Sequence, residues 1–206
     1  MTRTPTAIAT SSVRMLAANG DISALIVATA RAIINAEGLE RLSLEEVAET
    51  AGVDLETLTS RFPDRCALAA AVRESLFREL AFELQRAEAD ASPHDALLRM
   101  GTAYRTFASR NGNIYKRVTP SGEDASSAAL QLLWPIIDAF RRFVGAERAL
   151  LGTRTLVSFL HGFAVMEAND NFQLSGSIDD AFNFGLHAVI DGVRAQSGTQ
   201  PSFVTG

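Results

Sequence analysis

The side chains best suited to catalysis or metal binding are few in this sequence and lie far apart along it. The three histidines are His94, His161 and His187, and none has a partner at a metal-binding spacing such as His-x-x-x-His. The sequence also contains no glycine-rich phosphate loop and no Gly-x-Ser-x-Gly nucleophile motif. We therefore predict that the chain is not an enzyme and that it binds no metal ion and no cofactor.

The only cysteine is Cys66, which excludes an intrachain disulfide framework and a cysteine-rich zinc site. It falls in the first turn of an expected helix, beside Arg65, a position typical of reactive thiols. Two interpretations stay open, a redox sensor and a small packing residue, and we favour the second. This cysteine usage indicates a reducing, cytoplasmic compartment.

Composition and charge narrow the class of protein further. Among the 206 residues, 47% are hydrophobic and 21% are charged, which is typical of a folded globular chain. The net charge of −5 at pH 7 gives no overall attraction to nucleic acid, so any DNA binding requires a local patch. Charged residues interrupt the apolar stretches, and residues 1–20 lack the apolar run of a secretory signal. We expect no membrane-spanning segment and a mobile N-terminal arm.

The apolar residues recur at spacings of three and four, which predicts an all-α fold of about nine helices. Serine and aspartate residues precede most of the periodic segments and indicate helix N-caps. Pro135 should kink or divide the helix that contains it. With their caps, the expected helices span residues 23–37, 43–52, 54–61, 65–88, 92–110, 124–143, 146–168 and 177–194, with one helical turn at 114–118.

The segment LSLEEVAETAGVDLETLTSRFPDRCAL, residues 42–68, has the layout of a helix-turn-helix. Ser43 and Glu46 form an expected capping box, in which the serine accepts from the backbone and the glutamate reaches back. Gly52 supplies the turn between the two helices, and Asp54 caps the second. We predict that this second helix enters the major groove of DNA.

The same segment resembles the tetracycline-repressor (TetR) family of bacterial transcriptional regulators. The family pattern reads here as Ser43-Leu44, then Val47-Ala48-Glu49-Thr50-Ala51-Gly52-Val53, then Leu58-Thr59-Ser60-Arg61-Phe62-Pro63-Asp64-Arg65, and Leu68. Residues 156–163, LVSFLHGF, resemble the His-Gly segment in the C-terminal domain of one subgroup. The resemblance implies an N-terminal three-helix DNA-binding domain followed by a larger helical domain for ligand binding and dimerisation.

Two positions depart from the family pattern where the resemblance implies phosphate contacts. The usual tyrosine of the recognition helix is Thr59, which is shorter and offers less surface for stacking. The usual lysine of the next helix is Arg65, whose guanidinium is a competent phosphate ligand. The predicted contacts to double-stranded operator DNA come from Ser43, Thr57, Thr59, Ser60, Arg61 and Arg65.

The charge of this segment opposes DNA binding. Residues 43–73 carry six acidic side chains against three arginines, a net charge of −3. Helix capping accounts for Glu46, Asp54 and Asp64. Glu56 has no such role, and it either accepts a hydrogen bond from a cytosine amino group or repels the duplex. A solvated acidic face on a weak or altered DNA binder stays open as an alternative.

The resemblance also implies that the middle helices enclose an effector. Aromatic side chains on these helices suit a small apolar or aromatic ligand, although such spacing is equally typical of a core. His161 either bonds to a ligand or a partner subunit, or is a core histidine satisfied by a carbonyl, and we favour the core role. The predicted ligand-binding residues are Tyr104, Phe107, Trp134, Phe140, His161 and Met166.

The last two long helices carry more apolar surface than one neighbour can cover, which predicts a two-fold homodimer. Its expected interface residues are Leu156, Phe159, Leu160, Phe163, Phe182, Leu186, Val189, Ile190 and Val193.

We expect four regions: an arm at 1–20, a DNA-binding domain at 21–66, a ligand-binding and dimerisation domain at 67–196, and a polar tail at 197–206. The expected function is that of a transcriptional repressor that a small effector releases from its operator. The alternative is a helical dimer of the same architecture with weakened or lost DNA binding, which acts as a ligand- or protein-binding module.

Overall fold

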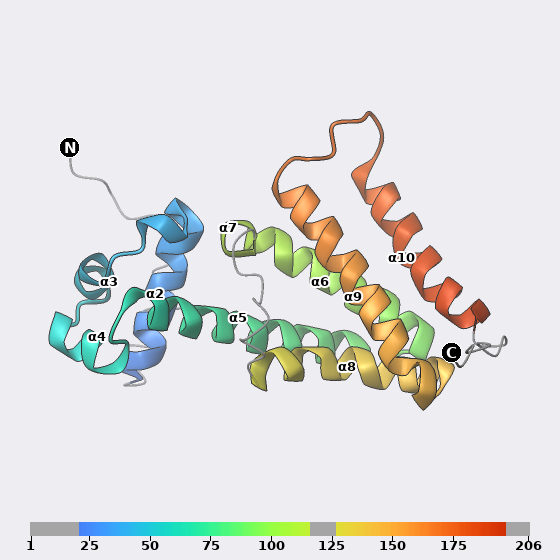
Figure 1. The fold of residues 1–206 in the computed structure, drawn as a ribbon, viewed down its shortest axis with the longest axis horizontal. Coiled ribbons are helices and arrows are strands. Elements are labelled where there is room, and N and C mark those ends of the chain that lie inside the picture. The colour runs from blue at the N-terminus through green and yellow to red at the C-terminus, as the bar shows by residue number, and fades with distance from the viewer. Residues whose placement is uncertain (1–20, 116–126, 197–206) are drawn as a thin grey trace, which may run out of the picture. The chain divides into compact units, whose positions relative to one another are not determined.

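The computed structural model describes residues 21–115 and 127–196, and all regular elements among them are helical (Figure 1). The predicted arm and tail lie outside the described residues. The all-α prediction is confirmed, and most helix ends fall within a residue of the predicted ones. The helices are α2 (Ile22–Glu37), η1 (Leu39–Arg41), α3 (Leu44–Ala51), α4 (Leu55–Arg61), α5 (Arg65–Glu88), α6 (Pro93–Arg110), α7 (Gly112–Tyr115), α8 (Ser127–Val144), α9 (Ala146–Ala168) and α10 (Ile178–Ala195).

The described residues divide into two compact units. Unit 1 contains the residues up to Leu76 together with 111–115, and unit 2 contains 77–110 and the residues from 127 onwards. The division falls within α5, later along the chain than the predicted boundary after residue 66. Unit 1 is therefore discontinuous in sequence, because α7 returns to it after α6 has contributed to unit 2.

Side-chain caps set the helix starts of unit 1. Asp21 Oδ1 accepts from the backbone N–H of Ala24 at 3.0 Å, and Asp64 Oδ1 accepts from that of Ala67 at 2.8 Å. The helices then pack on a shared apolar core. Its fully buried members include Ile26, Ile34, Val47, Leu58, Leu68 and Ile114.

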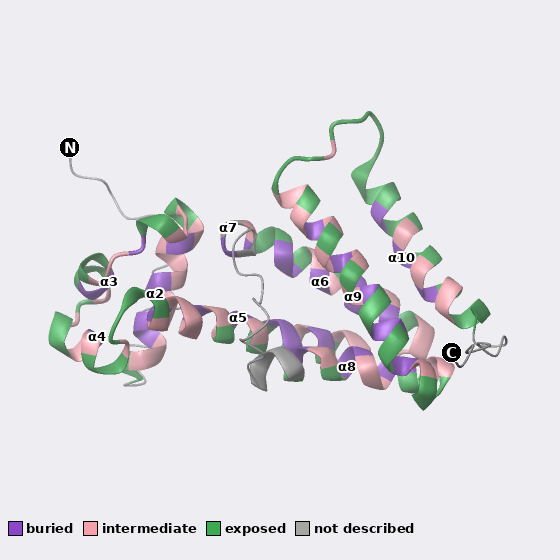
Figure 2. Cartoon of the chain, viewed as in Figure 1, coloured by how far each residue is buried: buried purple, intermediate pink, exposed green. Residues whose placement is uncertain are grey.

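In unit 2, α8 and α9 pack on each other, and both contact α6 and α10. Figure 2 shows buried residues along these helices. The fully buried side chains of unit 2 include Leu97, Met100, Ile136 and Phe140. Pro135 lies inside α8, which continues through it to Val144, so of the two predicted effects the proline does not divide the helix. The predicted kink stays a prediction.

Glycines bring the helices of unit 2 into close contact. A Cβ atom on Gly101 of α6 would lie 2.5 Å from Leu186 Cδ1 of α10. A Cβ on Gly152 of α9 would lie 2.7 Å from the ring of Phe140 on α8. A side chain at either position would push the helices apart, because real Cβ contacts of this length do not occur.

The helix α9 is long and apolar enough to cross a membrane by length and composition alone. The expectation that no segment reaches this limit is therefore wrong for α9. In the fold, α9 packs against α6, α8 and α10 and buries Leu156, Leu160 and Ala164 among them. Its apolar character therefore matches its place in the core of unit 2.

Candidate functional site

The turn between α3 and α4 presents α4 on the outside of unit 1. Gly52 ends α3 in the left-handed conformation, at φ 69°, and its backbone N–H bonds to the carbonyl of Ala48. Leu58 is fully buried and anchors α4 to the core. The outer side of α4 exposes Glu56, Ser60 and Arg61. This is the arrangement that a recognition helix requires.

Three of the predicted DNA contacts are hydroxyl groups of α4 that already donate hydrogen bonds within unit 1. Thr59 Oγ1 donates to the carbonyl of Leu55 at 2.9 Å, and Ser60 Oγ donates to that of Thr57 at 2.9 Å. Thr57 Oγ1 donates to Asp54 Oδ2 at 2.7 Å. A hydroxyl has one proton to donate, so each must rotate before it can donate to a phosphate.

The caps of α3 and α4 use part of the acidic charge. Ser43 Oγ accepts from the backbone N–H of Glu46 at 3.3 Å, and it donates to the carboxylate of Glu45 at 2.7 Å. The predicted bond from the backbone to the Ser43 hydroxyl is present, but the carboxylate that contacts Ser43 belongs to Glu45 and not to Glu46, which the capping box predicted to reach back. The hydrogen bond from Ser43 lowers the pKa of Glu45, and hydrogen bonds from the backbone and hydroxyl of Thr57 lower the pKa of Asp54.

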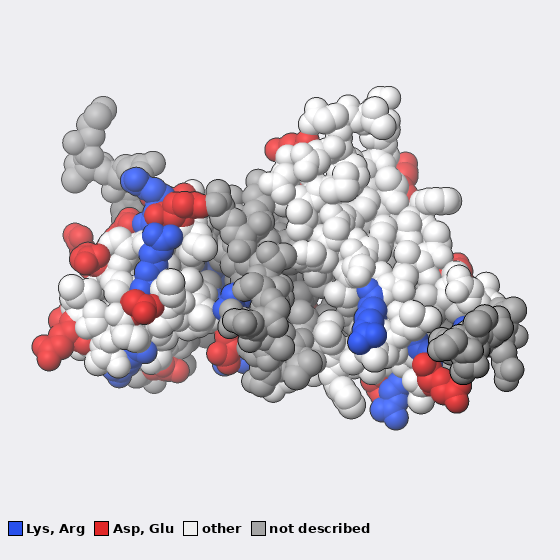
Figure 3. Space-filling view, viewed as in Figure 1, with Lys and Arg blue, Asp and Glu red and all other residues white. Residues whose placement is uncertain are grey.

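The two arginines predicted to contact DNA, Arg61 on a base or phosphate and Arg65 on a phosphate, are both exposed. Arg65 Nη1 donates to the carbonyl of Glu40 at 3.4 Å, and Arg61 lies in the last turn of α4. The visible face of unit 1 carries acidic side chains beside basic ones, so the positive charge is local rather than continuous (Figure 3).

Cys66, next to Arg65, is exposed, which excludes the packing role favoured from the sequence.

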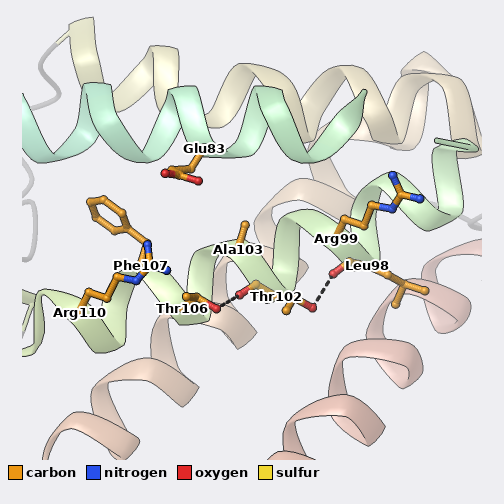
Figure 4. A pocket seen from close by; sticks show the side chains of 8 residues that line it. All are labelled: Glu83, Leu98, Arg99, Thr102, Ala103, Thr106, Phe107 and Arg110. Carbon is orange, nitrogen blue, oxygen red and sulfur yellow. Dashed lines mark hydrogen bonds between the residues drawn. The ribbon is translucent and has the colours of Figure 1, made fainter. Parts of the chain in front are cut away.

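A groove of about 410 Å³ lies in unit 2 between α5 and α6 (Figure 4). Two arginines and one glutamate give it charged groups, while leucine, alanine and phenylalanine supply apolar surface. Two threonines on its wall donate to backbone carbonyls of α6. Its lining is Glu83 from α5 and Leu98, Arg99, Thr102, Ala103, Thr106, Phe107 and Arg110 from α6.

Phe107 is the one predicted ligand-binding residue that lines this groove. Trp134 is 58% exposed and Met166 is also exposed, so these two do not line an internal cavity, and their assignment is corrected. Tyr104 and Phe140 are buried in the core. His161 is half-buried, and burial lowers its pKa below the ordinary value.

Most of the predicted interface residues belong to the interior of the protomer itself. Leu156, Leu160, Phe182, Leu186 and Ile190 are each at most 2% exposed, so they cannot present a surface to a partner, and this assignment is corrected. Phe159 stacks with Phe182 at a ring-centroid distance of 5.8 Å, and Phe163 meets Phe182 in an edge-on arrangement at 5.1 Å. Val189 and Val193 are half-buried. The exposed apolar residues of α9 and α10 are instead Leu150, Leu151, Met166, Ile178 and Phe184.

Arg105 of α6 joins α9 and α10, a role that no pattern in the sequence indicated. It donates to Glu167 through Nη2 at 2.5 Å and Nε at 2.9 Å, and its Nη1 lies 2.8 Å from Asp179 Oδ1. The guanidinium also lies over the rings of Phe163 and Phe182. These contacts raise the pKa of Arg105, chiefly through Glu167.

The structure also brings together two histidines that are distant in sequence. The ring centroids of His94 on α6 and His187 on α10 are 6.3 Å apart. His94 Nε2 lies 3.0 Å from Asp191 Oδ1, also on α10. The prediction of no metal site rested on the separation of the histidines, and that premise is wrong.

A helix-turn-helix unit followed by an all-helical unit with a ligand-sized groove defines the class of one-component transcriptional regulators. Residues 26–72 match the family model for bacterial regulatory proteins of the tetR family, and residues 97–189 match that for the tetracyclin repressor-like C-terminal domain. The chain belongs to the TetR family of transcriptional regulators. It is therefore a DNA-binding regulator, and members of this family are not enzymes.

Solved structures share the fold at low identity. A TetR variant from Acinetobacter baumannii AYE in complex with minocycline is 21% identical, with a TM-score of 0.63 over 84% of this chain and 97% of that one. BioQ with its double-stranded DNA operator is 20% identical, with a TM-score of 0.63 over 84% and 98% of the two chains. A protein of unknown function from Rhodococcus sp. RHA1 is 22% identical, with a TM-score of 0.70 over 84% and 95%. No curated protein matches the chain.

Proposed function

We propose that this protein is a homodimeric cytoplasmic repressor that binds a palindromic operator and is released from it by a small-molecule effector. The observation that carries the proposal is the helix-turn-helix of unit 1. Its second helix, α4, is anchored by Leu58 and exposes Ser60 and Arg61. Two such helices in a two-fold dimer fit two half-sites of one operator.

Electrophoretic mobility shifts with DNA fragments from around the gene test operator binding. We expect a specific complex with a Kd of about 10 nM at moderate salt. Arg61→Ala and Arg65→Ala should each weaken it and reduce the slope of log Kd against log salt by about one for each lost phosphate contact. Arg86→Ala, an exposed arginine of unit 2, is the matched control and should leave both quantities unchanged.

A second candidate function is supported by the charge of unit 1. The net charge of −3 in residues 43–73 and the shortened side chain at Thr59 favour a TetR-like dimer with weak or lost DNA binding. Such a protein would act as a ligand- or protein-binding module. The absence of a retarded fragment below about 1 µM protein, the weakest range of specific binding, would support this candidate over the repressor.

The groove in unit 2 is the proposed effector site. Its arginines, Arg99 and Arg110, outnumber the single carboxylate of Glu83 and flank an apolar stretch that includes Phe107. This lining suits an amphipathic anion better than the uncharged apolar or aromatic ligand expected from the sequence. The effector must bind the released state more tightly than the operator-bound state, because equal affinity shifts no equilibrium.

A panel of aliphatic and aromatic carboxylic acids, screened by thermal shift and then by operator release, tests the effector class. Thr106→Trp fills the groove and should abolish both responses while leaving operator binding intact. A compound that still releases this variant from DNA would place the effector site elsewhere.

The proposed dimer uses the outer sides of α9 and α10. Leu151, Met166 and Phe184 are exposed there, and Phe184 is 78% exposed. The visible face over these helices is mostly uncharged (Figure 3). Light scattering should show a dimer that Phe184→Glu dissociates. Phe82→Glu, at an exposed phenylalanine of α5, should leave the dimer intact.

A further inference from the structure

We propose that His94, His187 and Asp191 form a binding site for a divalent transition-metal ion, for which Zn²⁺ is the probe. The site lies where the first turn of α6 meets the C-terminal half of α10. It shares no residue with the groove between α5 and α6. It is therefore separate from both the proposed effector site and the DNA-binding unit.

The three side chains converge without any change of the backbone. One ligand atom from each lies within 4.8 Å of the others, and His94 Nε2 is 3.0 Å from Asp191 Oδ1. Tetrahedral Zn²⁺ with bonds of about 2.1 Å holds its ligand atoms about 3.4 Å apart. Small side-chain rotations therefore suffice to close the set around one ion.

The two ligands on α10 are placed by helix geometry. His187 and Asp191 are four residues apart, so both project from the same side of the helix. Both are exposed, and His94 is half-buried, so an ion can enter from solvent and keep a water molecule as its fourth ligand.

A carboxylate stands behind His94 in the position of an outer-shell partner. Asp95 Oδ1 lies 3.7 Å from His94 Nδ1, on the side of the ring opposite the proposed ligand atom Nε2. Ser92 Oγ donates to Asp95 Oδ2 at 2.7 Å and so orients this carboxylate. Histidines that bind metal through one ring nitrogen commonly donate the other N–H to a carboxylate, which fixes the tautomer.

The donor set selects the class of ion. Two imidazoles and one carboxylate suit Zn²⁺, Ni²⁺ or Co²⁺ better than Ca²⁺ or Mg²⁺, which prefer oxygen ligands. Arg194 lies over the ring of Phe143, and the centroid of that ring is 5.6 Å from that of His94. Bound metal would tie α10 to α6 and stabilise unit 2 by mass action.

Isothermal titration of the untagged, chelator-treated full chain with Zn²⁺ tests the site. We expect one ion per chain with a Kd of about 10 µM or tighter. His187→Asn and Asp191→Asn should each weaken binding at least about 10-fold, whereas His161→Asn and Cys66→Ser should not. Because His187 and Asp191 are exposed, these variants should fold normally, which circular dichroism checks without metal.

Thermal unfolding gives a second readout. Zn²⁺ should raise the Tm of the wild type and of the control variants, and it should leave the Tm of His187→Asn unchanged. Added Co²⁺ should give visible absorption bands that the same variant lacks. No binding at about 100 µM Zn²⁺, or undiminished binding by His187→Asn, would overturn the proposal, because such an affinity is too weak for three preformed ligands.

Discussion

The helix caps of unit 1 and the Arg105 contacts of unit 2 act over different ranges of sequence. In unit 1, the caps at Asp21, Ser43, Asp54 and Asp64 each bond to a backbone N–H three residues further on. In unit 2, the polar contact at Arg105 joins residues that are 62 positions apart. Caps of this kind also begin helices in unit 2, at Ser92 and Ser177, and unit 1 has one long-range polar contact, from Arg31 to Asn111. The caps follow from local sequence, whereas the contacts of Arg105 depend on residues that meet only in the folded chain.

This difference predicts where stability is concentrated. A lost cap exposes one helix end to water, which satisfies the freed groups at modest cost. A lost contact in the interior of unit 2 leaves a charge or an overlap that water cannot relieve. Substitutions in the two units should therefore differ in size as well as in kind.

The largest loss should follow Arg105→Ala, which removes the link between α6, α9 and α10. We expect the free energy of unfolding to fall by about 2–3 kcal/mol, because Glu167 is left partly buried without its partner. Urea denaturation followed by circular dichroism measures the change. Arg110→Ala, at the exposed end of the same helix, should stay within about 0.5 kcal/mol of the wild type. Equal effects at the two positions would contradict the special role of Arg105.

The glycine contacts of α9 offer a matched pair. Gly152→Ala should destabilise by about 1–2 kcal/mol, because its Cβ overlaps the buried ring of Phe140 by more than the gain in helix propensity offsets. A Cβ on Gly162 would meet no neighbouring atom within 4 Å, so Gly162→Ala should stabilise by up to about 1 kcal/mol. Thermal unfolding of both variants checks the opposite signs.

In unit 1, Ser43→Ala removes the cap of α3 and should lower the free energy of unfolding by about 1 kcal/mol. We expect this loss to be smaller than those of Arg105→Ala and Gly152→Ala. Ser60→Ala is the control, because Ser60 lies within α4 and donates only to a carbonyl of its own helix. That change should stay within about 0.5 kcal/mol. Urea midpoints measure both, and a larger loss for Ser60→Ala would contradict the dominance of caps.

The smallest expected effect is the change of folding stability with pH. The lowered pKa of His161 means that the unfolded chain binds its proton first, so unit 2 should lose stability as the pH falls below about 6.5. Because the pKa of Asp54 is lowered in the folded state, its carboxylate stabilises unit 1 above about pH 4. This stabilisation is lost only below that pH. Urea midpoints between about pH 7.5 and 5.5 should fall less in His161→Gln than in the wild type. An unchanged slope would remove His161 as the cause.

The helix positions could be predicted because their signals are local. Caps and apolar periodicity gave the ranges of α5, α6 and α9 to within a residue. The orientation of single side chains was predicted less well. For Trp134, the helical repeat of its neighbours on α8 could have shown which side it faces. On α8, Leu132, Ile136 and Phe140 follow the helical repeat, and Trp134 lies on the opposite side, where it is exposed.

The interior contacts of unit 2 could not be predicted from local patterns. His94 and His187 lie on helices whose pairing depends on how α6, α8, α9 and α10 pack together. The partners of Arg105 depend on the same packing. Five of the nine predicted interface residues are buried for the same reason, since α9 and α10 cover their most apolar sides within the protomer and leave other residues outside. That these two helices form the dimer interface stays a prediction.

The discontinuity of unit 1 has a consequence for protein engineering. Asn111 accepts a hydrogen bond from Arg31 Nη2 at 2.9 Å, and Ile114 is buried in the same unit. A chimera that carries only residues 1–66 onto another regulator would omit both residues and the first three turns of α5. A chimera that keeps unit 1 intact must therefore take two separate gene segments from this protein, one on each side of the segment that encodes residues 77–110.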